Sequence, residues 1–194
     1  MIVNSIYWKN EINTIINKLL KINSKKFTEK TSYQLEKYFF QTAYLIRKLY
    51  QSGKISDSLF KKDMVLYYYK PKKHINRIIW WDIDELYDFR TSIKCSIQLK
   101  YLLEQLIHSY TFIPIYNFDD KTECIQNIKC ILFHSDKERN KKTYSITLSQ
   151  YIDILKEVSS NYPSSMKQIF DEKEDDYILE IFLLKFFFIK RLHS

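Results

Sequence analysis

The residues of this chain whose types and spacing best suit catalysis are Glu104 and His108, within LLEQLIHSY. Side chains four residues apart lie on one face of a helix, so this carboxylate and this imidazole can touch. A carboxylate that contacts a histidine orients the ring and raises its basicity, as general acid–base catalysis requires. The pair also offers two metal ligands, but the sequence identifies no third, so we expect neither a metal nor another cofactor.

A structural role for His108 is the alternative. A histidine in the last turn of a helix can donate to the unpaired carbonyl groups there, and it suits the negative end of the helix dipole. A single Glu-x-x-x-His pattern is also a weak signal for a site. Both roles stay open from the sequence, and His108 is the first residue to test.

A second candidate site is the charged loop 134–142, HSDKERNKK. Its cations Lys137, Arg139, Lys141 and Lys142 can contact phosphate groups from the tip of a hairpin. Charged residues also favour an ordinary solvated turn, which is the competing explanation for this composition.

A third candidate is the segment 61–81, in which basic residues alternate with tyrosine and tryptophan. Cations follow a nucleic-acid backbone and aromatic faces stack on bases, so this composition suits single-stranded nucleic acid. The alternative is that the aromatic side chains belong to the core and only the lysines are exposed. We expect the phosphate contacts of this segment to come from Lys70, Lys72, Lys73 and Arg77.

The overall charge favours an anionic partner. The net charge is +8, but only five of the basic residues are arginine, and Ile, Asn, Lys, Tyr and Phe are all abundant. A basic surface attracts nucleic acid or an acidic protein face. AT-rich coding DNA produces the same excess of lysine without any functional meaning.

Several enzyme classes do not fit the sequence. It contains one glycine and lacks GxxxxGK[ST], GxGxxG, HExxH and GxSxG, so we do not expect a P-loop nucleotide hydrolase. Three cysteines without a CxxC pair predict neither a disulfide framework nor a zinc site. The first residues show no apolar stretch after a basic one, and the longest apolar run is too short for a bilayer. We therefore expect a cytoplasmic protein with no membrane partner.

The elements that must position these residues follow from hydrophobic spacing. Apolar stripes predict helices over 4–22, from about Ser32 to Gly53, and over about 95–112, where Pro114 ends the helix. The single glycine, Gly53, is expected in the left-handed conformation that closes a helix. Asp82–Phe89 is expected to form a short helix.

Other segments of the chain have a different pattern. Met64–Tyr69, Ile128–His134 and Thr143–Leu148 have strand-like compositions, and the last two predict an antiparallel hairpin. Ser149 is expected to cap a fourth helix. Residues 177–189 are apolar on nearly all sides, so their periodicity does not distinguish a strand from a helix.

Together these patterns predict an α+β, mainly helical fold, a helical bundle with a small antiparallel sheet formed by the hairpin at about 128–148. The length of 194 residues suits a single domain, 1–194. It would comprise a helical part at about 4–112 and, at about 125–194, the hairpin with a C-terminal helix.

The strings YFFQTAYLIRKLYQSGKIS (38–56), WWDIDELYDF (80–89), LLEQLIHSYTFIP (102–114) and LFHSDKERNKKTYSI (132–146) resemble a family of small uncharacterised bacterial proteins. That family pairs a helical part with a hairpin that carries an NSD-like turn, here HSD at 134–136. The resemblance covers about residues 35–165 and implies no particular activity.

The helical part also resembles HEPN domains, which are helical bundles of toxin and phage-defence systems and often ribonucleases. Such enzymes place an arginine four to six residues before a histidine late in a helix. His108 matches the histidine, but Glu104 occupies the comparable place of the arginine. The resemblance therefore implies a bundle, and either a ribonuclease or a non-catalytic relative.

Three functions remain as expectations. The first is a non-enzymatic binding or partner protein, in a bacterial defence or mobile-element system, whose basic aromatic surface contacts nucleic acid or protein. The second is a HEPN-like ribonuclease in which His108 transfers protons, Glu104 orients it and a lysine stabilises negative charge. The third is an obligate subunit, or a homo-oligomer, that docks through the apolar segment Ile181–Ile189.

Overall fold

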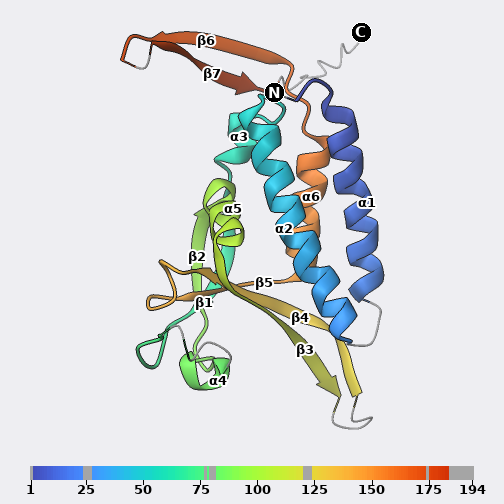
Figure 1. Cartoon of the computed structure of the whole chain (residues 1–194), viewed down its shortest axis with the longest axis vertical. Coiled ribbons are helices and arrows are strands. Elements are labelled where there is room, and N and C mark those ends of the chain that lie inside the picture. The colour runs from blue at the N-terminus through green and yellow to red at the C-terminus, as the bar shows by residue number, and fades with distance from the viewer. Residues whose placement is uncertain are drawn as a thin grey trace, which may run out of the picture.

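The computed structural model describes residues 2–23, 28–76, 78, 82–119, 124–173 and 175–183 (Figure 1). The helices are α1 (Ser5–Asn23), α2 (Glu29–Gln51), α3 (Asp57–Phe60), α4 (Ile83–Leu86), α5 (Leu99–Ile107) and α6 (Leu148–Ser160). The strands are β1 (Asp63–Tyr69), β2 (Ile93–Gln98), β3 (Ser109–Asp119), β4 (Cys124–Ser135), β5 (Thr143–Ile146), β6 (Ser165–Asp171) and β7 (Asp176–Phe182). The fold is thus α+β.

Five strands form one antiparallel sheet in the order β2-β1-β5-β4-β3, and β6 and β7 form a separate two-stranded hairpin. The expected hairpin at 128–148 is present, since β4 pairs with β5 and Leu132 lies opposite Ser145. The sheet is larger than the small one expected, because β5 also pairs with β1, Tyr67 lying opposite Ser145, and because β2 and β3 add a strand at each edge. The four-residue β5 therefore joins two pairs of longer strands.

One face of the sheet packs against α2, α5 and α6, and α1 packs on α2 and α6, so that all four helices share the main hydrophobic core (Figure 1). Phe133 of β4 and Tyr144 of β5 point to this side. Between the helices, the ring of Phe39 in α2 stacks on Tyr151 in α6 with centroids 3.8 Å apart. The Tyr151 hydroxyl also lies 2.7 Å from Thr42 Oγ1. Ring stacking and a hydrogen bond therefore both hold α2 against α6.

The opposite face of the sheet is covered by the segment that surrounds α4. Ile75, Leu86 and Tyr87 form a second buried cluster with Leu132 of β4, whose side chain points away from the main core. This alternation of Leu132 with Phe133 follows from the two-residue period of a strand. The expected short helix at 82–89 is present as α4, which is four residues long.

The first two helices match their predicted positions, with shifted ends. α1 covers nearly the predicted residues 4–22. α2 begins before Ser32, because Thr28 forms a capping box with Thr31. Gly53 has a φ of 68°. The N–H of Lys54 donates to the carbonyl of Leu49 at 2.8 Å, which closes α2 as predicted from the glycine.

The single helix predicted at 95–112 is wrong. The chain there forms β2, then the nine-residue α5, then β3. Alternate residues of β2 are half-buried and exposed, and the strand pairs with β1, so tertiary pairing decides its conformation. Pro114 does not end a helix but lies within β3, which pairs only with β4 among the described strands, and an edge strand tolerates proline.

Two further expectations need correction or completion. The cap of α6 is Thr147 rather than Ser149, since Thr147 Oγ1 accepts from the Gln150 N–H. The ambiguous apolar region begins as a strand, β7, while residues 184–194 lie outside the described part of the chain. Arg77, Trp80 and Trp81 of the basic aromatic segment also lie outside it.

Candidate functional site

His108 is placed by the short helix α5. Leu102, Leu103 and Leu106 are buried against the core and fix the orientation of this helix. Glu104 and His108 therefore lie on its outer side, and His108 is the residue at which the helix ends. The His108 side chain is 63% exposed, so it is accessible to a ligand.

The predicted contact between Glu104 and His108 is present, and a third residue extends it. Glu104 Oε2 lies 3.4 Å from His108 Nε2. The other oxygen, Oε1, lies 3.0 Å from Nη1 of Arg47, which comes from α2. Arg47 holds the carboxylate in place, and the carboxylate in turn orients the imidazole.

Sequence reasoning missed Arg47, because the search for an arginine followed spacing within one helix. Arg47 follows the buried Ile46 on α2, and only the packing of α2 beside α5 brings it to Glu104. No local pattern in the sequence signals this contact.

His108 opens onto a pocket of about 730 Å³ between α5 and the loop that follows β4. Gln105 connects the two walls, since its Oε1 accepts from the Ser135 N–H at 3.0 Å. The described residues that line the pocket are Tyr101, Glu104, Gln105, Ile107, His108, Ser109, Ser135, Asp136 and Lys137. The structure thus brings together His108 and the charged loop, two regions that the sequence treats as separate candidates.

The charges in this pocket are unequally satisfied. Each carboxylate of the pocket is paired with an arginine that does not line it. Glu104 is paired with Arg47 of α2, and Asp136 with Arg139 of the same loop at 2.8 Å. Lys137 is exposed and forms no ion pair within the described residues. Lys137 and His108 are therefore the groups that the pocket can offer to an anionic ligand.

The other cations of the loop contact groups of the protein itself. Lys141 and Lys142 lie 3.1 and 3.9 Å from the carboxylate of Glu138. Lys142 also lies over the ring of Tyr144, and Arg139 lies over the ring of Tyr110 at 5.4 Å. These residues stabilise the shape of the loop, and Lys137 is the loop cation directed to the pocket.

The loop is anchored to the layer around α4. Tyr87 donates to the carbonyl of Arg139 at 2.8 Å, and its hydroxyl lies 2.9 Å from Nε2 of the buried His134. Asn140 exchanges two hydrogen bonds with the backbone of Ile75, at 2.6 and 3.2 Å. The segment at 70–76 therefore lies directly beside the loop, which connects it with the His108 pocket.

Within that segment, some of the lysines predicted to contact phosphate already interact with groups of the protein. Lys72 donates to the carbonyl of Asp84 at 2.7 Å, and Lys73 lies 3.9 Å from Glu85. Lys70 and His74 are exposed, and neither side chain forms an ion pair within the described residues. Tyr67, in β1, is also exposed, with 44% of its surface accessible.

Among the described residues, no group of three or more His, Cys, Asp or Glu side chains is arranged to hold a metal ion. No described helix is long and apolar enough to cross a membrane. Comparisons with protein-family models, with curated proteins and with solved structures found no match to this chain.

Proposed function

We propose that the chain binds single-stranded nucleic acid, with the His108 pocket and the adjoining segment 70–76 as its binding surface. The observation that carries the proposal is the loop 136–142, which lines the pocket with Lys137 and bonds through Asn140 to Ile75. A strand that crosses this loop meets His108 and Lys137 first, and then Lys70 and His74.

The chemistry of this path suits a phosphate backbone. Lys70 and Lys137 are exposed cations without ion pairs in the described part of the chain, so they are available to phosphate groups. The exposed ring of Tyr67 can stack on a base. The carboxylates of the pocket are neutralised by Arg47 and Arg139, which reduces their repulsion of a polyanion.

Binding can be measured by the anisotropy of a labelled single-stranded RNA over a range of salt concentrations. We expect affinity to fall as salt rises, because bound phosphates release counterions. Lys137→Glu and Lys70→Glu should each weaken binding, with a logarithmic salt slope less steep by about 0.7 for each phosphate contact that is lost.

The matched control is Lys37→Glu, which makes the same charge change at an exposed position of α2. It should leave the affinity and the salt slope close to those of the original protein. Equal losses in all three variants would show only a response to net charge and would contradict a defined site.

Cleavage of the bound RNA is a second candidate function, favoured by the contacts that join Arg47, Glu104 and His108. In this reaction His108 would remove the proton of a ribose 2′-hydroxyl, whose oxygen attacks the adjacent phosphorus. A 2′,3′-cyclic phosphate forms, and the bond to the 5′-oxygen of the next nucleotide breaks, this oxygen taking up a proton from water and leaving as a hydroxyl. Glu104 would position the ring, and Lys137 would stabilise the charge that develops on the phosphate.

We expect His108→Ala to reduce RNA cleavage by about 10²- to 10⁴-fold, the usual contribution of a general acid or base. Glu104→Gln should reduce it less, while both variants keep the circular dichroism spectrum of the original protein. The control is Lys37→Ala, at an exposed position of α2 outside the proposed RNA path, which should leave cleavage unchanged. RNA that stays intact with the unsubstituted protein, or is cut equally by His108→Ala, would reject cleavage and leave the binding proposal standing.

A further inference from the structure

The β6–β7 hairpin, residues 165–183, extends away from the rest of the protein as an arm (Figure 1). At its root, the side chains of Met166 and Ile181 lie beside Gly53 at the end of α2. Ile181 is buried there, whereas no described helix covers the outer part of the arm. The arm is thus held at one end only.

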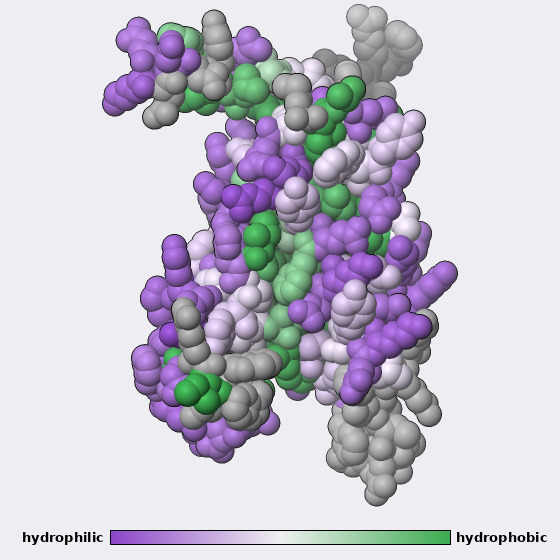
Figure 2. Space-filling view, viewed as in Figure 1, coloured by the Kyte–Doolittle hydropathy of each residue, from purple (hydrophilic) through white to green (hydrophobic). Residues whose placement is uncertain are grey.

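Both faces of the arm carry exposed apolar side chains. Phe170 and Leu179 point to one face, and Ile169 and Ile178 are paired on the other. Figure 2 shows apolar residues along the arm beside polar ones. Seven large apolar side chains are between 37% and 51% exposed: Met166, Ile169, Phe170, Ile178, Leu179, Phe182 and Leu183.

Such an arm needs a partner surface. A lone two-stranded hairpin is marginally stable in water and gains stability from a further layer. Contiguous exposed apolar residues of this kind mark sites of protein association. The question is therefore which surface covers the arm.

The charge of the chain is divided between the arm and the body. Residues 165–183 contain two basic and six acidic residues, whereas residues 1–164 contain 26 basic and 17 acidic ones. The acidic residues gather at the turn of the arm, which includes Asp171, Glu172 and Asp175. The acidic arm of one copy is therefore complementary in charge to the basic body of another copy of the same chain.

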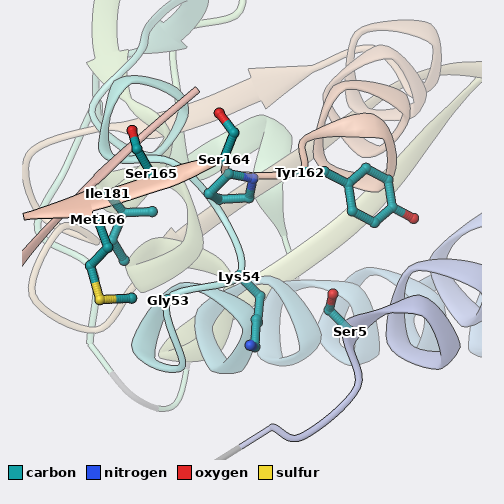
Figure 3. A pocket seen from close by; sticks show the side chains of 9 residues that line it. Ser5, Gly53, Lys54, Tyr162, Ser164, Ser165, Met166 and Ile181 are labelled. Carbon is teal, nitrogen blue, oxygen red and sulfur yellow. The ribbon is translucent and has the colours of Figure 1, made fainter. Parts of the chain in front are cut away.

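A basic pocket that suits the acidic turn lies at the root of the arm. This pocket of about 340 Å³ is bordered by Lys54 and Ser5 from the body and by Met166 and Ile181 from the arm (Figure 3). None of the described residues that line it is acidic. The ammonium group of Lys54 forms no ion pair within the described part of the chain.

A second ammonium group lies next to this pocket. Lys9 is completely buried, donates to the carbonyl of Asn161 and lies 3.6 Å from the ring centre of Tyr162, which borders the pocket. Burial, with a smaller contribution from the charge of Lys54, lowers the pKa of Lys9 to about 8. Within the described residues neither of these two cations has a carboxylate partner, so an acidic group placed in the pocket would be attracted by both charges.

We propose that two copies of the chain form a dimer in which the two arms lie antiparallel and each acidic turn occupies the Lys54 pocket of the other copy. A two-fold axis places the turn of one arm at the root of the other, because both arms have the same length. The exposed apolar residues of each arm then cover those of its partner. The acidic turn and the Lys54 pocket, which are both present in every copy of the chain, thus form the two sides of the interface.

The test is the mass of the full chain in solution, measured by sedimentation velocity over a range of protein concentrations. We expect a dimer that weakens as salt rises. Two variants should each raise the dissociation constant of the dimer by about tenfold or more. One is Glu172→Lys/Asp175→Asn in the turn, and the other is Lys54→Glu in the pocket. Asparagine suits position 175 because the φ of Asp175 is 50°.

The decisive measurement mixes the two variants. A reversed turn then faces a reversed pocket, and an unchanged turn faces an unchanged pocket, so the mixture should dimerise again. Glu36→Lys and Lys37→Glu are matched controls on α2 that should leave the dimer unchanged. A chain that stays monomeric, a dimer insensitive to both arm and pocket variants, or a mixture that does not recover would each overturn the proposal.

Discussion

His134 shows how a single buried residue can determine the shape of a charged loop. Its Nε2 lies 2.9 Å from the Tyr87 hydroxyl, and its Nδ1 lies 3.1 Å from the Ser135 carbonyl. Burial is the main cause that lowers the pKa of His134, and it outweighs the hydrogen bond to the Ser135 carbonyl, which alone would raise that pKa. The folded protein therefore favours the neutral ring.

This preference predicts a loss of stability in mild acid. Because the pKa of His134 is lower in the folded than in the unfolded state, the unfolded chain binds more protons at low pH. The neutral His134 ring therefore makes its full contribution to the free energy of unfolding above about pH 6.5, the usual histidine pKa. This contribution decreases as the pH falls below that value. Urea unfolding at pH 7.5 and pH 5 should show this loss.

His134→Gln, which cannot take up a proton, should reduce the pH dependence of the unfolding free energy. His74→Gln is the matched control, because His74 is exposed. An unchanged pH dependence in His134→Gln would contradict the assignment of the loss to the buried ring.

The candidate site was only partly predictable from single residues. The Glu104–His108 contact follows from helical spacing alone, even though the helix around it is much shorter than predicted. Arg47 and Lys137 could not be assigned to this site in advance, because they reach it through the packing of α2 and the fold of a loop. Charge at 137–142 was visible in the sequence, but not which cations would be paired with Glu138.

At the scale of elements, Gly53 links the end of α2 to the root of the arm. Its φ of 68° disfavours any residue with a side chain, and a Cβ there would lie 3.1 Å from Cδ1 of Ile181. We expect Gly53→Ala to lower the unfolding free energy by about 1–2 kcal/mol, the usual cost of the left-handed conformation.

Gly53→Asn separates the two causes. Asparagine tolerates this backbone conformation better than alanine but also carries a Cβ. A smaller loss in Gly53→Asn than in Gly53→Ala, measured by chemical denaturation, would assign the cost to φ. Equal losses would assign it to the contact with Ile181, and no loss in either variant would contradict both.

The elements that sequence reasoning predicted well are those with a local cause. α1 and α2 have apolar stripes, and the β4–β5 hairpin has two strand-like runs around a charged turn. The region 95–112 failed because its first residues suit a helix or a strand about equally, and pairing with β1 selects the strand. Local spacing cannot report a partner about 30 residues away.

At the scale of the whole molecule, sequence patterns indicated an α+β fold but not the size of the sheet. One reason is that β2 and the start of β3 lie in the region 95–112 that was predicted as a helix, and the other is the pairing of β1 with β5, which joins Tyr67 to Ser145. Both segments were identified as strand-like, yet nothing in either one specifies the other. The separate arm was also hidden, because the apolar composition of 177–189 suits a buried element and β7 is exposed instead.

The position of β5 has a consequence for how the protein is made. During translation, α1, α2 and the pairs β1–β2 and β3–β4 all leave the ribosome before this strand of four residues. Until Thr143–Ile146 emerges, the two halves of the sheet have no strand to join them, and the core positions that β5 and α6 occupy stay unfilled. α6 follows directly in the chain, so the closing of the sheet by β5 and the docking of α6 are expected to form one late folding event.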